Sequence, residues 1–270
     1  MTDNLSSYSP LQLASDSIGA GPDLVILHGL FGDGENWRNQ AKKLAADFTV
    51  HSLDMRNHGA SPHASQISYP AMAADVRRTC QSLGVQEFHL LGHSMGGKTA
   101  MQLALDHPSV VKHLIIVDIA PKQYPHHHQA VLDGLTQIQT LSRSGNLTSR
   151  RQADSALAEH IDDKHTRAFL LKNLQRINNG DYQLRINLDA IISCYDEIAA
   201  AVPASPTAPR PGPTLFIKGS ESDYLQTDDR ATILGLFPNA TLKTIGGAGH
   251  WPQSEKPDIV YRVINRFLHD

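Results

Sequence analysis

Ser94 lies in the sequence GHSMG (92–96), between an apolar run that ends at Leu91 and a helical pattern over 95–106. A serine on a sharp strand-to-helix turn presents its hydroxyl to substrate, and glycines two residues before and after it leave room for the close chain approach. The first turn of the helix adds amide hydrogens and positive potential where negative charge would develop. The motif therefore predicts Ser94 as the nucleophile of an acyl-transfer reaction.

A tetrahedral oxyanion needs two amide donors, one after the nucleophile and one from the loop after an early strand. Met95 N–H is the first candidate, and Leu30 N–H in the loop HGLFG (28–32) is the second. Phe31 N–H is an alternative to Leu30. We expect His28 to pack and orient this loop, because it precedes a tight glycine turn.

The general base must be a histidine at another strand end. The chain has 15 histidines, and His250 stands out because GGAGHW (246–251) follows the last apolar run. The order of serine first and histidine last also fits. The run His126, His127 and His128 permits a metal site, but neighbouring helical residues point in different directions. We favour a solvated helix start for this run and expect no metal.

The acid that orients the base has two main candidates. Asp118 follows the apolar run 114–117, and Asp223 lies in the loop after the run 215–217. Both follow a strand and keep the order serine, acid, histidine. We favour Asp118, because a charge at the end of an apolar run is costly without partners. Its alternative role is a turn or cap before Pro121.

Short apolar runs alternate with longer helical patterns, which indicates βα units around a parallel sheet. The expected strands are 24–27, 48–53, 88–91, 114–117, 215–217 and 241–245, and the expected helices are 36–46, 70–83, 95–106, 227–236 and 257–268.

The alternation stops between Pro121 and Ala204, where apolar residues recur at helical spacing. The groups are 131, 135, 138 and 141, then 170, 174 and 177, then 191, 195 and 198. The proline-rich stretch 203–213 reads as an extended connector. Together with the motif at Ser94, this pattern predicts an α/β-hydrolase fold: a mostly parallel twisted sheet flanked by helices, with a helical lid inserted between two strands. The expected parts are core 1–121, lid 122–204 and core 205–270.

Composition favours a small-molecule substrate. The 24 basic and 27 acidic residues give a formal charge of -3. This near balance does not indicate a basic surface that would bind nucleic acid or an anionic membrane. Residues 1–19 do not resemble a signal peptide, and no run is long enough to span a membrane. Cys80 and Cys194 are expected as buried free thiols, in keeping with a cytoplasmic location. The sequence does not indicate an oligomeric state.

Several blocks look like the bacterial YbfF-type esterases and their mitochondrial relatives. They are HGLFG (28–32), DMRNHGASP (54–62), GHSMGGKTAM (92–101), VDIAP (117–121), GAGHW (247–251) and, more weakly, RINLDAI (185–191) in the lid. The resemblance implies an esterase for short acyl esters, with acyl thioesters as further substrates and no cofactor. In that group the loop after the lid reads more like GGNSPYV, without an acid, which supports Asp118. This chain departs from the group by carrying Asp223 there, and Asp189 is a third candidate.

Three further expectations concern the surroundings of the site. Asp54 and Arg56 are expected to contact each other and to hold their loop beside the oxyanion strand, without a direct role for His58. Chain-length preference is expected to depend on Tyr124, Phe169, Leu170, Tyr195 and Tyr224.

The same catalytic residues would serve a thioesterase, an amidase, a perhydrolase or a carbon–carbon bond hydrolase. Ser94 argues against dehalogenases and epoxide hydrolases, whose nucleophile is an aspartate. A non-catalytic ligand-binding relative is the alternative of a different class, since the fold alone does not decide function.

Overall fold

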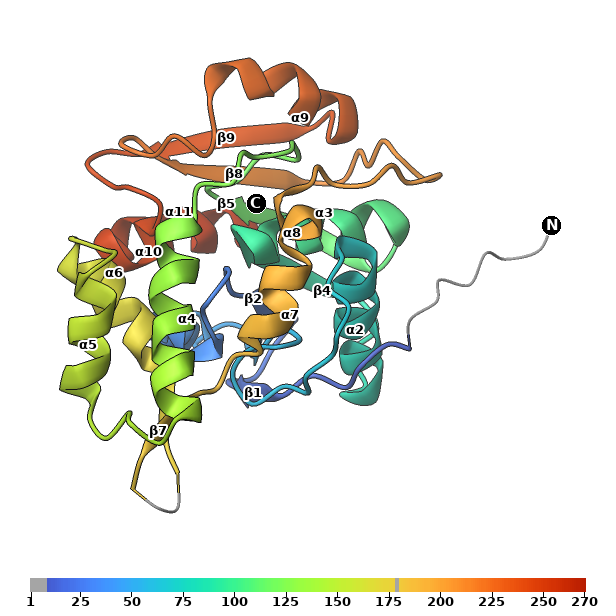
Figure 1. The fold of residues 1–270 in the computed structure, drawn as a ribbon. Coiled ribbons are helices and arrows are strands. Elements are labelled where there is room, and N and C mark those ends of the chain that lie inside the picture. The colour runs from blue at the N-terminus through green and yellow to red at the C-terminus, as the bar shows by residue number, and fades with distance from the viewer. Residues whose placement is uncertain (1–8, 178–179) are drawn as a thin grey trace.

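The computed structural model describes residues 9–177 and 180–270, and within them a seven-stranded sheet forms the centre of the molecule (Figure 1). Its order is β1-β3-β2-β4-β5-β8-β9, and every pair is parallel except β1 with β3. The strands are β1 (Ser15–Ile18), β2 (Asp23–Leu27), β3 (Thr49–Leu53), β4 (Phe88–His93), β5 (Val111–Val117), β8 (Thr214–Gly219) and β9 (Ala240–Ile245). All six expected strands are confirmed, and β1 is an additional antiparallel edge strand.

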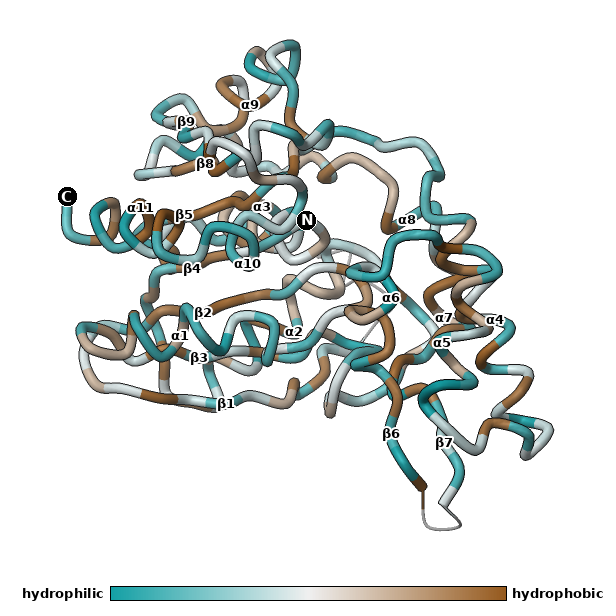
Figure 2. Tube along the Cα trace, turned by 90° about the vertical axis from the view of Figure 1, so that its left-hand side faces the viewer, coloured by the Kyte–Doolittle hydropathy of each residue, from teal (hydrophilic) through white to brown (hydrophobic). Residues whose placement is uncertain are grey.

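Strand side chains alternate between two apolar layers, one on each face of the sheet. Val25 and Leu27 of β2 pack with α2 (Tyr69–Ser82) and α3 (Met95–Asp106), whereas Leu24 and Ile26 pack with α1 (Arg38–Leu44) and α11 (Pro257–His269). Because both faces are covered, central strands are apolar at successive positions. Figure 2 shows this as brown stretches along β2 and β5, with α1 and α11 on the near face.

The remaining elements of the core are short. They are α9 (Arg230–Leu236), α10 (Pro252–Glu255) and the 3-10 helices Gly34–Trp37 and Thr227–Asp229. A third 3-10 helix, Leu171–Asn173, belongs to the segment described next. The expected helices over 36–46, 70–83, 95–106, 227–236 and 257–268 are thus all present, with small shifts at their ends.

Between β5 and β8 the chain leaves the sheet and forms a helical segment, here called the inserted segment (residues 129–199). It contains α4 (Gln129–Arg143), α5 (Arg150–Ala158), α6 (Lys164–Leu170), α7 (Leu188–Ser193) and α8 (Tyr195–Ala199). In Figure 2 its helices gather at the right, beyond one end of the sheet. The boundaries 122–204 expected for a lid stay a prediction.

Helical spacing was misleading at one place in this segment. Leu174 and Ile177 were expected on a helix with Leu170, but the helix ends and β6 (Leu174–Arg176) pairs with β7 (Tyr182–Leu184) as an antiparallel hairpin. Three residues at helical spacing give too weak a signal to separate a last helical turn from a short strand.

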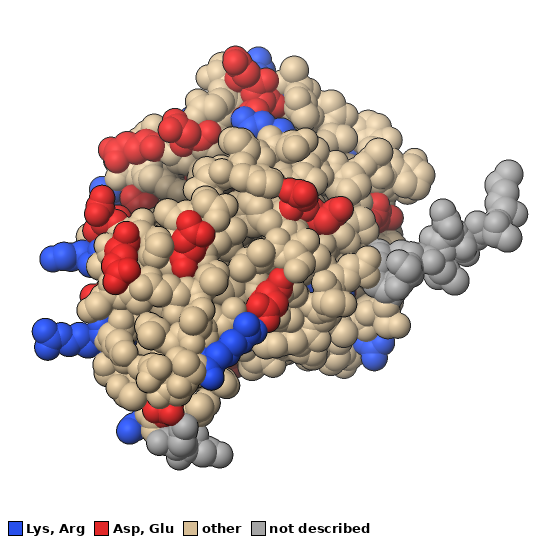
Figure 3. Space-filling view, in the orientation of Figure 1, with Lys and Arg blue, Asp and Glu red and all other residues tan. Residues whose placement is uncertain are grey.

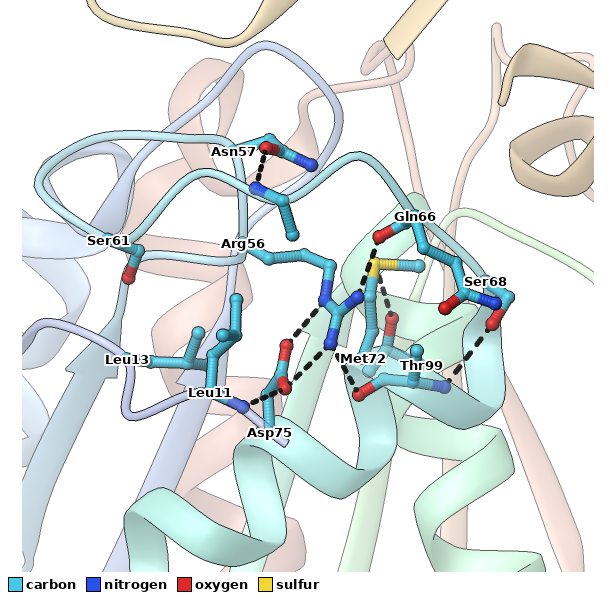
Figure 4. A network of polar contacts seen from close by, with 12 residues as sticks. Leu11, Leu13, Arg56, Asn57, Ser61, Gln66, Ser68, Met72, Asp75 and Thr99 are labelled. Carbon is cyan, nitrogen blue, oxygen red and sulfur yellow. Dashed lines mark hydrogen bonds and ion pairs between the residues drawn. The ribbon is translucent and has the colours of Figure 1, made fainter. Parts of the chain in front are cut away.

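The expected contact between Asp54 and Arg56 is wrong. The Arg56 guanidinium pairs with Asp75 of α2, at 2.6 Å from Nε to Oδ2 and 2.8 Å from Nη2 to Oδ1, and it also donates to Gln66 O (Figure 4). Asp54 accepts instead from Gly34 N–H and Ala60 N–H. The carboxylates of Asp54 and Asp75 both help to fix the loop after β3. Asp54 does so by accepting from backbone amides, and Asp75 by pairing with Arg56.

Acidic and basic side chains are scattered over the face shown in Figure 3. Among the described residues, none of the helices is long and apolar enough to cross a membrane. Cys80 and Cys194 are both free, as expected; Cys80 is buried, whereas Cys194 is half-buried.

Candidate active site

Ser94 lies at the turn between β4 and α3 with φ 52° and ψ −119°, a strained backbone for a residue other than glycine. The chain is crowded on both sides of this turn. A Cβ at Gly92 would lie 2.2 Å from Gly96 O, and one at Gly96 would lie 2.4 Å from His28 O. The two glycines of the motif are therefore required by backbone packing, as the sequence predicts.

His250 follows β9, and three neighbours fix its position. Its Nδ1 lies 2.8 Å from Asp118 Oδ2. The Tyr224 ring stacks on the imidazole, with centroids 3.7 Å apart and planes at 17°. His93 Nε2 donates to His250 O at 2.8 Å, and burial lowers the pKa of His93 to about 3, which keeps that ring neutral.

Asp118 directly follows β5 and has a φ of 53° and a fully buried side chain. Besides His250, its carboxylate accepts hydrogen bonds from Gly219 N–H at 3.0 Å and from the Ser222 hydroxyl. Ser222 occupies the position at which many members of the fold carry the acid. In this chain its hydroxyl instead donates a hydrogen bond to Asp118, which follows the neighbouring strand β5.

The other two candidate acids lie elsewhere. Asp223 is exposed and accepts from Gln226 Nε2 at 3.3 Å. Asp189 pairs with Arg143 at 2.5 Å on the surface of the inserted segment. Of the three carboxylates, the structure brings Asp118 into contact with His250.

Two neighbouring backbone amides in the loop after β2 differ in their hydrogen-bond partners. Phe31 N–H donates to His58 Nε2 at 3.2 Å, and Phe31 O accepts from Asn173 Nδ2 at 2.8 Å. Among the residues that the structure describes, Leu30 N–H and Met95 N–H have no such acceptor, and both residues line a pocket beside Ser94. Leu30 is thus better placed as a donor than Phe31.

His28 and His58 hold this loop in place as neutral rings. Met55 N–H donates to His28 Nε2 at 2.8 Å, and His28 Nδ1 bonds to Gly29 O. Burial lowers the pKa of both histidines, that of His58 to about 3. The expectation that His28 packs and orients the loop is confirmed, and His58 acts in the same way on Phe31.

A cleft of about 790 Å³ contains Ser94 and His250. No direct hydrogen bond joins their side chains in the described part of the chain, and bonds of this kind are often long before substrate binds. His127 and His128 also line the cleft and contact the Tyr224 hydroxyl, at 2.7 and 3.2 Å.

The sequence did not predict that His127 and His128 line the cleft and contact Tyr224, or that the Tyr224 ring stacks on His250. Each of the two histidine contacts joins the residues just before the inserted segment to the loop after β8, which lie 96 or more positions apart. The remaining histidine of the run, His126, is exposed and pairs with Asp196 at 2.9 Å. Within the described ranges, no group of three or more histidine, cysteine or acidic side chains is arranged to hold a metal.

A family model described as "alpha/beta hydrolase fold" matches residues 22–257. The chain belongs to this family. The YbfF resemblance is confirmed as well: Esterase YbfF of Escherichia coli is 35% identical over 249 residues, covering 92% of this chain and 93% of that protein. The sn-1-specific diacylglycerol lipase ABHD11 of Xenopus laevis is 38% identical over 256 residues, covering 92% and 80%. A solved structure entitled "Marine microorganism esterase" matches with a TM-score of 0.91 and 38% identity, over 95% of this chain and 99% of that one.

Proposed function

We propose that this protein is a carboxylic ester hydrolase for short-chain acyl esters, working through an acyl-enzyme on Ser94. The observation that carries the proposal is the contact between His250 and buried Asp118 in a cleft that also contains Ser94. A carboxylate at Nδ1 holds the imidazole in the tautomer whose Nε2 accepts a proton.

In the first half-reaction, the Ser94 oxygen attacks the ester carbonyl while His250 Nε2 takes the hydroxyl proton. The oxyanion that forms accepts hydrogen bonds from Leu30 N–H and Met95 N–H. The carbon–oxygen bond to the alcohol then breaks, and His250 gives its proton to the departing oxygen. Asp118 stabilises the imidazolium throughout.

In the second half-reaction, His250 takes a proton from water, and the resulting hydroxide attacks the acyl carbon. The bond to Ser94 breaks, its oxygen recovers the proton, and the acid leaves. No cofactor takes part in these steps. The inserted segment serves as the lid of this site, because Asn173 within it, and His127 and His128 just before it, reach the residues around Ser94.

The names of the relatives support ester hydrolysis, since one is an esterase and another a lipase. The free thiols Cys80 and Cys194 support a cytoplasmic location.

The test is a kinetic panel of chromogenic esters and acyl thioesters with the wild type, Ser94→Ala and a matched Ser144→Ala variant. Ser144 is exposed on the inserted segment, and among the described residues its hydroxyl donates to Leu141 O and accepts from Asn146 Nδ2. We expect Ser94→Ala to lose at least a thousandfold in kcat and to escape labelling by a fluorophosphonate, whereas Ser144→Ala keeps both properties. Equal activity of the wild type and Ser94→Ala would contradict the proposal. A preference for thioesters would show that the substrates are acyl thioesters rather than esters.

A further inference from the structure

Two spaces of very different size meet at Ser94. One is a pocket of about 30 Å³, here called the inner pocket, and the other is the cleft of about 790 Å³. Leu30, Ser94 and Tyr224 line both. The two sides of an ester bound to Ser94 therefore have two spaces of unequal size available to them.

The chemistry decides which side goes where. His250 must protonate the departing oxygen, so the alcohol side of the ester has to lie next to its imidazole. His250 lines the cleft and does not line the inner pocket. Met95, whose amide is the proposed donor to the oxyanion, lines the inner pocket instead. The acyl chain thus points into the inner pocket and the alcohol into the cleft.

The far wall of the inner pocket is held by hydrogen bonds between core helices and the end of α8. The Tyr69 hydroxyl donates to Ile198 O at 2.5 Å, and Lys98 Nζ donates to Ala200 O at 2.6 Å. Both side chains are buried. Such a wall does not move away easily to admit a longer chain, and about 30 Å³ is only about twice the volume that one water needs.

The cleft offers a large apolar surface to the alcohol. Phe169 and Trp251 both line it and pack against each other, with ring centroids 5.6 Å apart and planes at 45°. Val131 and Leu170 add aliphatic surface, and its other lining residues include His165, Lys172 and Glu255. A long or bulky apolar alcohol can be covered here.

We propose, building on the esterase function above, that the preferred substrates are esters of a short acid with a large apolar alcohol, selected by the inner pocket and the cleft respectively. This goes beyond a short-acyl preference, because it assigns the bulk of the substrate to the leaving group. An ester with the same atoms in the opposite arrangement is then a poor substrate.

Two isomers test this directly. Hexyl acetate and ethyl hexanoate share one formula, so they differ in which side carries the chain. We expect kcat/KM to be at least tenfold higher for hexyl acetate, after division by the rates of alkaline hydrolysis, since one methylene that a pocket rejects already changes rates by about tenfold or more. Equal values, or a preference for ethyl hexanoate, would overturn the assignment of the acyl chain to the inner pocket and the alcohol to the cleft. If turnover of either ester still depended on Ser94, the esterase function would not be contradicted. Absence of Ser94-dependent turnover of both would overturn both proposals.

A pair of variants locates the selection. Ile198→Ala enlarges the inner pocket, and we expect it to lower the preference for hexyl acetate at least fivefold. Ile192→Ala removes the same atoms from the exposed face of α7 and should leave the ratio unchanged. An unchanged ratio in folded Ile198→Ala would contradict a limit set by this pocket; if that variant does not fold, the isomer pair on the wild type still decides.

Discussion

Replacing Asp118 by asparagine keeps the shape of the side chain and removes the charge behind His250. The carboxylate accepts from Gly219 N–H, the Ser222 hydroxyl and His250 Nδ1. An asparagine can keep its oxygen on Gly219, which turns its amide group toward Ser222 and His250. The imidazole must then accept at Nδ1 and carry its proton on Nε2, where it cannot take the proton of Ser94.

The expected loss is large because the wrong tautomer stops the first proton transfer. The same exchange in well-studied triads lowers kcat by about 10⁴, which corresponds to about 5 kcal/mol of transition-state stabilisation. KM should change little, because buried Asp118 does not line the cleft. Asp118→Asn should therefore show its effect in kcat with a short-chain chromogenic ester.

Asp223→Asn is the matched control. Its side chain is exposed and bonds to Gln226, so we expect kcat within twofold of the wild type. Thermal unfolding of both variants separates loss of chemistry from loss of fold. A folded Asp118→Asn enzyme with kcat within tenfold of the wild type would refute the reasoning, and so would a loss of a hundredfold or more in Asp223→Asn.

Three further predictions concern stability. Asp75→Ala leaves Arg56 buried without its carboxylate partner, which should lower the free energy of unfolding, measured in urea, by about 3–5 kcal/mol. A loss under about 1 kcal/mol would contradict a stabilising Arg56–Asp75 pair. Burial lowers the pKa of His58 and His93 to about 3, so between pH 6.5 and 3 the unfolded chain binds more protons than the folded one. Stability should accordingly fall as pH falls from 6.5, by up to about 1.4 kcal/mol per pH unit for each histidine, and urea midpoints that stay level from pH 6.5 to 5 would contradict this. Gly96→Ala should lower the midpoint of thermal unfolding or prevent folding, because the added Cβ would clash with backbone atoms. Gly235→Ala should leave the midpoint unchanged, because open space surrounds that position. Equal midpoints for the two variants would contradict this prediction.

The sequence predicts best those elements that are buried on both sides. β2, β4, β5 and β8 each contain a run of apolar residues, because helices cover both faces of the sheet. β1 has the sequence SDSI and lies on an edge, largely exposed, so no apolar pattern marks it. The β6–β7 hairpin is missed for a similar reason, since its strands have three residues each.

Site residues follow the same division. Ser94 and His250 are predictable because local sequence fixes their turns, and each follows a recognisable strand. The stacking of Tyr224 on His250, and the pairing of Arg56 with Asp75, depend on how distant segments cross. Nothing in the residues next to Tyr224 or Arg56 specifies the partner, so local patterns cannot predict these contacts.

Among the residues that the structure describes, four other than glycine have positive φ: Phe31, Asn57, Ser94 and Asp118. Each such conformation costs roughly 1 kcal/mol or more, against a total stability of about 5–15 kcal/mol for a typical domain. Glycine at any of them would relax the backbone, but at Ser94 and Asp118 it would also remove the group proposed to do the chemistry. Selection for thermal stability alone would therefore push these positions toward an inactive protein, and stabilisation of this fold is better sought on the surface helices far from the strand ends.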